Sequence, residues 1–393
     1  MKQTLYLAWR YLAYHRVKTL ILVFSITLIV YLPIGLRVLV DQSSRQLTAR
    51  AEATPLIVGA KGSPLELVLN SLYFRSDYPE LMRYEQATRV SSSQLATAIP
   101  MYVRFNAQGY PIVGTSYEYF EYRGLEIVAG RQLGILGECV LGSRAAQALG
   151  AGPGDFVISS PESVFDLAGV YPLRMRVAGV LGFSDTADDD AIFVDVRTTW
   201  IIEGLGHGHQ DLTLPEAAAS VLTRDSSNVV GNAAVVQYNE ITEDNIDSFH
   251  FHGDVSQNPL TAVVVVPPDQ KSSALLQGRY QGDDEVAQIT RPVTVMNELL
   301  GTILTVQSFI TAGAVIVGIA TLATAALVFM LSLRLRRREI ETLFKIGGSR
   351  LSVASVMTSE IVAVLLAGVI LAGGLTFLTS QFGSAAIRAF IRM

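Results

Sequence analysis

Two histidine pairs are the residues of this sequence whose type and spacing best suit metal chemistry. Four of the five histidines form His-x-His pairs, His207 with His209 and His250 with His252. In the alternating segment from Phe249 to Gly253, a β-strand would point both imidazoles of the second pair to one face, an arrangement that can bind zinc. The four histidines are therefore either a zinc site or two unrelated surface pairs.

Acidic residues near the pairs could complete a zinc shell. The candidates are Asp211, Glu240, Asp247 and Asp254. The glycine-rich segment from Gly204 to His209 is expected to be a loop or a subdomain boundary, and a flexible loop could deliver further ligands to the second pair. Zinc is the one cofactor that these residues suggest, and a structural, a sensing and a cargo role all stay open.

A basic, amphipathic segment from Arg334 to Arg350 is the second feature with a possible mechanism. Ile340, Leu343 and Phe344 recur at helical spacing and form an apolar stripe among basic residues. The glycine pair that begins at Gly347 is expected to end this helix. The segment is either a docking surface for a partner protein or an ordinary basic anchor beside a membrane.

The sequence lacks the motifs of common catalytic sites. It has no G-x-S-x-G or H-E-x-x-H pattern and no G-x-x-x-x-G-K-[ST] phosphate loop. The single cysteine, Cys139, cannot form a disulfide within the chain and is expected to be a small buried apolar residue. We therefore expect a protein that is not an enzyme, and any ATP hydrolysis must come from a separate subunit.

Three apolar stretches predict membrane-spanning helices. Half of the 393 residues are apolar and only 17% are charged, which is unusual for a water-soluble protein. Residues 19–36, 303–333 and 361–379 each approach or exceed the roughly 20 residues that a spanning helix needs. The first stretch lacks the cleavage site of a signal peptide, so it is expected to remain as an anchor.

Charge asymmetry predicts how these helices are oriented. Residues 1–18 carry four basic residues and no acidic one, and the loop 334–350 is also strongly basic. Basic loops tend to stay in the cytoplasm, so both should lie inside. Residues 41–302, with 17 basic and 32 acidic residues, should then lie outside.

The segment before the first span, from Thr4 to His15, is amphipathic. It is either a helix that lies on the inner membrane surface or a downward extension of the spanning helix. Arg10 and Arg16 would be available to lipid phosphates, so membrane lipid is an expected partner. Two pairs of small residues, Ala314 with Gly318 and Gly368 with Ala372, are candidate helix-packing faces.

The large insert has the pattern of a mixed α/β domain. Strands are expected at 111–114, 174–181, 191–196 and 261–266, and helices at 142–149 and 214–222. The predicted fold class is α+β: three transmembrane helices with a large mixed α/β domain between the first and second. The predicted domains are 1–40, 41–302 with two subdomains, and 303–393 with the helix at 334–350.

The run RRREIETLFKIGGSR from Arg336 to Arg350, followed by an apolar helix that opens at Glu360, resembles the coupling region of ATP-binding-cassette permeases of the MacB/FtsX/LolCE type. The order of parts is also similar: one helix, a large periplasmic domain, then further helices. The insert carries a pattern similar to the core of that periplasmic domain, at Pro100, Ile112–Thr115, Tyr119–Phe120, Gly130–Arg131, Glu138–Gly142, Ala145–Leu149 and Gly154–Asp155.

The resemblance implies a permease subunit in the bacterial inner membrane. Its expected partners are a cytoplasmic ATPase, a second copy in a homodimer, and a periplasmic adaptor or substrate protein, with no nucleic acid. Members of the family usually have a fourth helix, which has no counterpart after residue 379 here. The residues implied to couple to the ATPase are Arg338, Glu339, Ile340, Leu343, Phe344 and Gly347.

Two functions stay open at this point. The permease either exports or hands over an envelope substrate, or it transmits motion without transport and regulates an extracytoplasmic enzyme or receptor. A zinc-linked role for the histidine pairs is compatible with both.

Overall fold

The computed structural model describes residues 2–75, 77–160, 172–208, 221–224, 229–231, 240–251, 253–282, 284–335, 337–345 and 349–391. The chain forms two compact units. The first, called the helical unit here, comprises residues 1–49 and 297–393, and the second, called the core domain, comprises residues 50–296.

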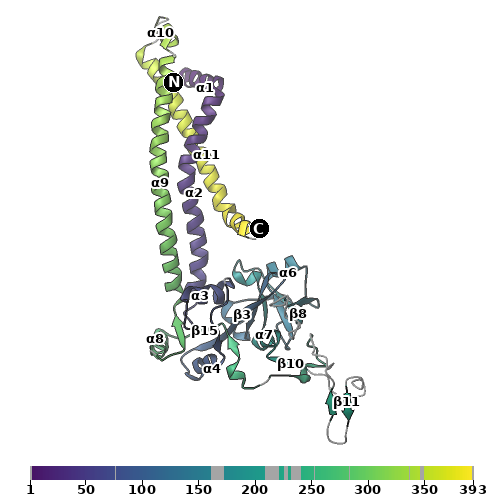
Figure 1. Ribbon diagram of the computed structural model, residues 1–393. Helices are drawn as coiled ribbons and strands as arrows, with labels where there is room; N and C mark the ends of the chain where they lie inside the picture. The colour runs from purple at the N-terminus through teal and green to yellow at the C-terminus, as the bar shows by residue number, and fades with distance from the viewer. Residues whose placement is uncertain are drawn as a thin grey trace. The chain divides into compact units, whose positions relative to one another are not determined.

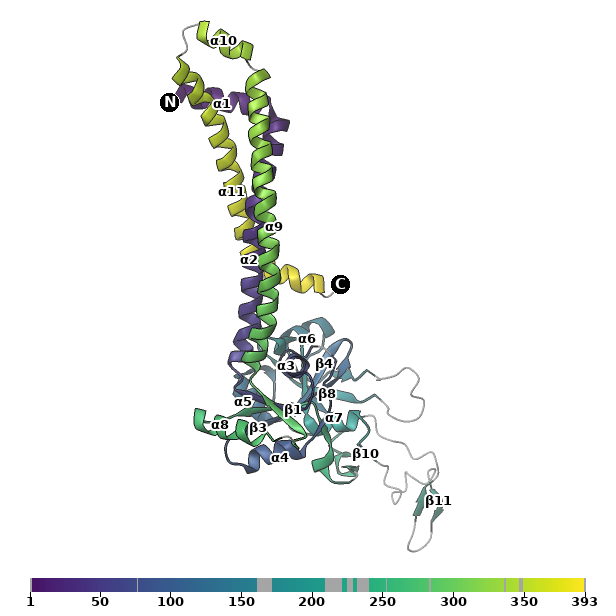
Figure 2. The same ribbon diagram turned by 60° about the vertical axis from the view of Figure 1, so that its left-hand side comes forward.

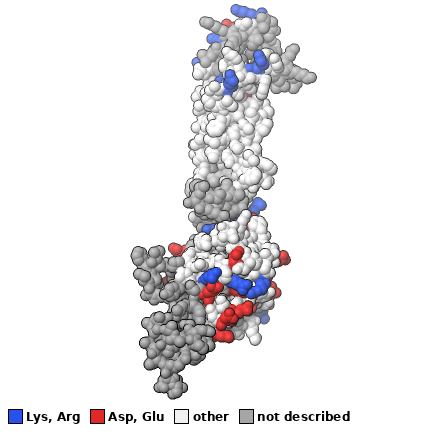
Figure 3. Space-filling model, turned by 90° about the vertical axis from the view of Figure 1, so that its right-hand side faces the viewer, with Lys and Arg blue, Asp and Glu red and all other residues white. Residues whose placement is uncertain are grey.

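The helical unit is built from long helices (Figure 1). Three of them are long and apolar enough to cross a membrane, over Arg16–Gln42, Pro292–Val328 and Val353–Gly383, in agreement with the three predicted stretches. In Figure 3 the middle of this unit is free of blue and red atoms. The helices are α1 (Lys2–Tyr14), α2 (Arg16–Glu52), α9 (Pro292–Leu335), α10 (Arg337–Lys345) and α11 (Arg350–Ile391).

Small and polar residues bring α2 and α11 together within the helical unit. A Cβ atom on Gly368 would lie 2.6 Å from Ile26 Cγ2, so only glycine allows this approach. The Thr27 hydroxyl donates to the Gly368 carbonyl at 3.2 Å, and one turn further Ala372 is buried. Gly368 and Ala372 therefore lie in a packing face, as their spacing predicts.

The core domain is organised around one continuous ten-stranded sheet in the order β16-β1-β15-β3-β4-β9-β6-β8-β5, with β7 paired to β8. The pairs β4–β9 and β6–β8 are parallel and the others antiparallel. The strands are β1 (Leu56–Ala60), β3 (Thr97–Ala107), β4 (Tyr110–Thr115), β5 (Ile127–Gly130), β6 (Glu138–Leu141), β7 (Phe156–Ile158), β8 (Arg174–Leu181), β9 (Ile192–Asp195), β15 (Ala262–Val266) and β16 (Ala287–Thr290).

Three two-stranded sheets and six helices complete the described part of the core domain. The short strands are β2 (Met82–Arg83) with β14 (Pro259–Leu260), β10 (Gly206–Gly208) with β13 (Phe249–Phe251), and β11 (Val221–Arg224) with β12 (Val229–Gly231). The α-helices are α3 (Pro64–Tyr73), α4 (Glu85–Ser92), α5 (Tyr117–Arg123), α6 (Ser143–Leu149), α7 (Val196–Ile202) and α8 (Gln270–Arg279), with 3-10 turns at η1 (Ala187–Asp190), η3 (Ile246–Ser248) and η4 (Val255–Gln257).

Local sequence explains several of these elements. The hairpin β3–β4 turns at Gln108 and Gly109, both with positive φ, as a two-residue hairpin requires. Helix α3 starts with Ser63, whose hydroxyl accepts from the Glu66 N–H, and Pro64 occupies its first turn. Cys139 is fully buried on β6, as expected, and burial raises the pKa of its thiol.

Each element predicted for the insert can be compared with the structure. The four predicted strands correspond to β4, β8, β9 and β15, and the helix at 142–149 corresponds to α6. The expected helix at 214–222 is wrong at its end, because 221–222 belong to strand β11, and residues 214–220 lie outside the described residues. Of the loop or subdomain boundary expected at 204–209, the loop is wrong in part, because residues 206–208 form β10 by pairing with β13, and the boundary stays a prediction. Two subdomains stay a prediction.

Glycines of the core pattern fill positions that no side chain could occupy. A Cβ atom on Gly142 would lie 2.2 Å from the Asp188 carbonyl oxygen. The Gly142 N–H donates to the Ala191 carbonyl at 2.8 Å, which fixes β6 next to η1. This part of the core pattern therefore has a structural role, because only glycine allows the close approach at position 142.

A substitution at Gly142 tests this interpretation. We expect Gly142→Val to destabilise the core domain by about 2–4 kcal/mol, because backbone atoms of η1 must move away from the new side chain. Thermal unfolding of the purified variant measures the effect. The control is Gly62→Val, because nothing lies close to a Cβ atom at that position; it should lose less than about 1 kcal/mol of unfolding free energy. Gly109→Val is unsuitable as a control because φ is positive at Gly109.

Candidate functional site

The predicted coupling segment forms a short helix between two long ones. Helix α10 lies in the helical unit, after α9 and before α11 (Figure 2). Ile340 is half-buried, and the Arg337 guanidinium lies 3.6 Å from the Glu341 carboxylate one turn later. The expected amphipathic helix is thus present, and its exposed ends carry basic side chains.

Most of the predicted coupling side chains lie outside the described residues. The backbone of Arg338, Glu339, Leu343 and Phe344 is part of α10, whereas Gly347 is not described. Their role in coupling to an ATPase therefore stays a prediction, supported by the helical spacing of 340, 343 and 344 on one described helix.

The strand pairing places one histidine of each pair opposite the other in the backbone register. In the antiparallel pair β10–β13, His207 is the direct partner of His250. The His250 ring is exposed, and its Nδ1 lies 3.2 Å from the Ser248 carbonyl oxygen. The side chain of His207 and all of His209 and His252 lie outside the described residues.

Two of the four candidate acids have other partners. The Glu240 carboxylate accepts from the Arg174 guanidinium at 2.8 Å, and Asp254 caps η4 by accepting from the Ser256 N–H at 2.9 Å. Asp211 lies outside the described residues. Within the described ranges, no group of three or more metal-ligating side chains is present, so a zinc site stays a prediction.

A buried ionic cluster lies within the core domain, which begins at Arg50 in the last turn of α2. Arg50, in the last turn of α2, donates to both carboxylate oxygens of Asp188, at 2.6 and 2.8 Å. It also donates to the Tyr119 hydroxyl at 2.7 Å, and that hydroxyl donates in turn to Asp188 at 2.7 Å. We call Arg50, Tyr119 and Asp188 the buried cluster.

Burial strengthens the electrostatics of this cluster. Arg50 is 8% exposed and Asp188 is 2% exposed. Burial alone would disfavour the charged carboxylate, but the adjacent Arg50 guanidinium outweighs it and holds the pKa of Asp188 below its ordinary value. The pKa of the Tyr119 hydroxyl is raised by its burial, so this group stays protonated and can donate to Asp188. The cluster is therefore an ion pair at neutral pH.

Further contacts hold the same chain segment. The Thr54 hydroxyl donates to the Arg50 carbonyl at 2.9 Å and accepts from the Arg123 guanidinium at 2.9 Å. The Tyr122 hydroxyl donates to the Ala53 carbonyl. Residues of helix α5 and turn η1 therefore both form hydrogen bonds with the chain at the end of α2.

The sequence reasoning missed this cluster. The core pattern contains Tyr119 only as part of a Tyr-Phe pair, and it contains neither Arg50 nor Asp188. The available signal is a cationic residue near the end of a long helix, combined with the acidic run from Asp188 to Asp190 directly before an apolar strand. No local rule joins residues that are 138 positions apart.

Comparisons with known proteins point to one family. The family model described as "MacB-like periplasmic core domain" matches residues 19–230. No curated protein matches the chain significantly in sequence. Among solved structures, the periplasmic region of MacB from Actinobacillus actinomycetemcomitans is similar at 14% identity with a TM-score of 0.35, covering 65% of this chain and 94% of that one.

A second solved structure is also similar to the chain. The extracellular domain of the noncanonic ABC-type transporter YknZ from Gram-positive bacteria has 12% identity and a TM-score of 0.33, covering 60% of this chain and 98% of that one.

Proposed function

Because the chain belongs to the family of ATP-binding-cassette permeases with a MacB-like periplasmic core domain, we propose that it transmits motion from a separate cytoplasmic ATPase to its own periplasmic domain. The motion would export or hand over a substrate in the bacterial envelope. The observation that carries the proposal is the family match together with three candidate spans and the short amphipathic helix α10.

The proposed topology follows from charge. With α1 and α10 in the cytoplasm of a bacterium with an inner membrane, the acidic insert lies in the periplasm. Energy must come from a partner, since the sequence has no phosphate-binding loop. In this proposal, α10 of each copy in a homodimer docks on one ATPase subunit.

The buried cluster supports a mechanical role for α2. This helix is continuous from Arg16 to Glu52, and its last turn belongs to the core domain. Because Arg50 is held by Asp188 and Tyr119, the end of α2 cannot rotate or withdraw without breaking buried hydrogen bonds. A helix whose end is held in this way can transmit a displacement along its axis.

Purification from the native membrane tests the proposed function. We expect an ATP-binding-cassette ATPase to co-purify with the tagged, detergent-solubilised chain, and reconstituted vesicles containing both to move a substrate when ATP is added. Co-purification of an envelope hydrolase, with ATP-dependent activation of that hydrolase and no movement of cargo, would favour the transmission role. Recovery without any ATPase under mild conditions would contradict the proposal.

We also propose zinc binding by the histidine pairs, supported by the position of His207 opposite His250 on β10–β13. We expect His207→Ala combined with His250→Ala to weaken zinc binding at least about 100-fold, measured by titration of the metal-free protein. His15→Ala removes the remaining histidine, which is in neither pair, and should leave zinc binding unchanged. Equal zinc binding by all three proteins would contradict this site.

A further inference from the structure

A groove in the helical unit combines basic and apolar walls. It has a volume of about 650 Å³ and lies between the start of α2 and the end of α9. Its lining residues are Tyr14, His15, Arg16, Val17, Lys18, Ile21, Leu22 and Val328. A volume of this size is in the range that holds a small-molecule ligand.

The position of the groove along the spanning helices is that of a membrane surface. Arg16 is the first residue of the first candidate span, and Val328 lies five residues before the end of the apolar stretch 303–333. Residues at the ends of spanning helices lie near the lipid headgroups, where apolar chains and phosphate groups meet. A ligand in this groove would therefore have a polar end and an apolar end.

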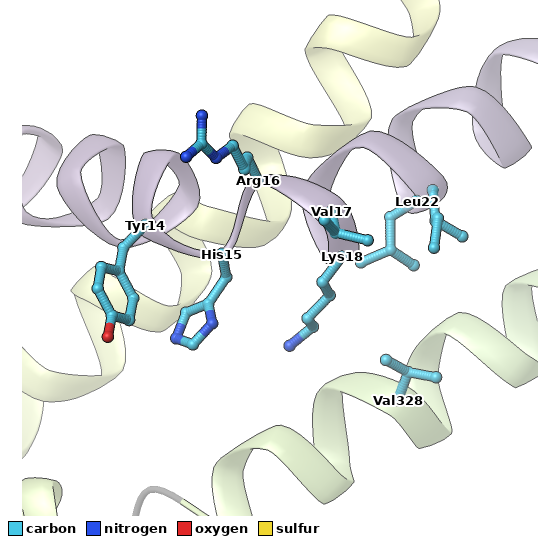
Figure 4. A pocket seen from close by; sticks show the side chains of 8 residues that line it. Tyr14, His15, Arg16, Val17, Lys18, Leu22 and Val328 are labelled. Carbon is cyan, nitrogen blue, oxygen red and sulfur yellow. The ribbon is translucent and has the colours of Figure 1, made fainter.

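The side chains that line the groove match a ligand with one polar end and one apolar end. Figure 4 shows the Lys18 ammonium, the His15 ring and the Tyr14 ring on the side of α2 that faces Val328, whereas the Arg16 guanidinium points to the other side. Val17 and Ile21 are exposed apolar residues of the same wall. The cation and the two polar rings suit an anionic headgroup, and the apolar wall suits an acyl chain.

The turn between α1 and α2 holds these groups in place. The Thr19 hydroxyl donates to the Leu12 carbonyl at 3.0 Å and thereby satisfies the end of α1. The His15 ring is packed between two tyrosines, with ring centroids 4.4 Å from Tyr11 and 4.9 Å from Tyr14. The headgroup end of the groove is therefore preformed, which lowers the entropic cost of binding.

We propose that this groove is a binding site for one anionic phospholipid of the leaflet that α1 faces. Lys18 and the polar rings of Tyr14 and His15 bind the phosphate-containing headgroup, and Val17, Ile21, Leu22 and Val328 contact an acyl chain. This site goes beyond the proposed coupling to an ATPase and does not depend on it, since lipid binding needs only the helical unit of the full chain.

Native mass spectrometry of the full chain with added lipid tests the site. We expect phosphatidylglycerol to bind more tightly than phosphatidylcholine, and millimolar inorganic phosphate not to displace it. We expect Lys18→Glu to weaken phosphatidylglycerol binding roughly 30-fold, because each cation near a membrane surface contributes about a fivefold factor and the substitution reverses one charge.

Arg37→Glu is the control, since it reverses the same charge on the same helix at an exposed residue that does not line the groove. It should change binding less than about twofold. Val328→Trp should weaken binding of the same lipid without any change of charge, because the ring fills the apolar end of the groove. Equal losses in the Lys18 and Arg37 variants would overturn the site, and displacement by inorganic phosphate would overturn the assignment to a lipid.

Discussion

Replacing Leu343 and Phe344 with Asp should abolish association of the ATPase with the permease while leaving membrane insertion intact. In the proposed complex, the apolar stripe of α10 is buried against the ATPase. Burial of one large apolar side chain contributes about 1.5–3 kcal/mol, so losing two weakens binding at least roughly 100-fold even before the carboxylates are desolvated. The measurement is co-purification of the ATPase with the tagged double variant, quantified against the wild type.

A matched control separates the apolar stripe from added charge. Thr342 and Ser349 are exposed, and Thr342→Asp with Ser349→Asp adds the same two negative charges. We expect this control to retain most of the ATPase, with a loss below about tenfold, because exposed charges are largely screened. If the stripe variant keeps its ATPase, the docking assignment of α10 is wrong, whatever the control does.

The sequence predicted the parts of the fold that follow from local physics. Membrane spans need a minimum apolar length, and the three predicted stretches overlap the three candidate spans. Short β-type runs of apolar residues indicated β8 and β15, and the helical period indicated α6 and α10. Each of these signals is contained within a window of one element.

Other parts could not be predicted because their causes lie far apart in the chain. Gly206–Gly208 resembles a loop on its own, and it becomes a strand only because it pairs with Phe249–Phe251. The buried cluster joins Arg50 to residues 69 and 138 positions away. From the sequence alone, Asp188 is one member of a polar run, and its burial follows only from the packing of η1.

The buried cluster leads to the second large effect, a loss of core-domain stability in single variants. Arg50→Met leaves the Asp188 carboxylate buried without its cation, and Asp188→Asn leaves the guanidinium without its anion. Removing one partner of a buried ion pair typically costs about 3–5 kcal/mol. We expect each single variant to lose stability in this range.

The double variant provides the control for this prediction. When both charges are absent, no unpaired charge stays buried, so Arg50→Met with Asp188→Asn should be at least about 2 kcal/mol more stable than the sum of the single losses predicts. Trp200 is buried in the core domain, and with Trp9→Phe it is the only tryptophan. Its fluorescence during urea unfolding of the full chain in detergent measures the free energy of unfolding. Strict additivity would show that the two side chains do not act as a pair.

The same ion pair predicts how stability depends on pH. The folded pKa of Asp188 lies below its ordinary value of 3.8, because Arg50 stabilises the carboxylate more than burial disfavours it. The unfolded chain therefore binds a proton first as the pH falls, so the contribution of the pair is complete well above pH 3.8 and is lost progressively below it. We expect the stability difference between wild type and Asp188→Asn to be constant from pH 6 to 8, within about 0.5 kcal/mol, and to shrink below pH 3.8. A difference that stays constant down to the acid transition would contradict an ionised Asp188 in the folded protein, and with it the ionic attachment of α2 to the core domain.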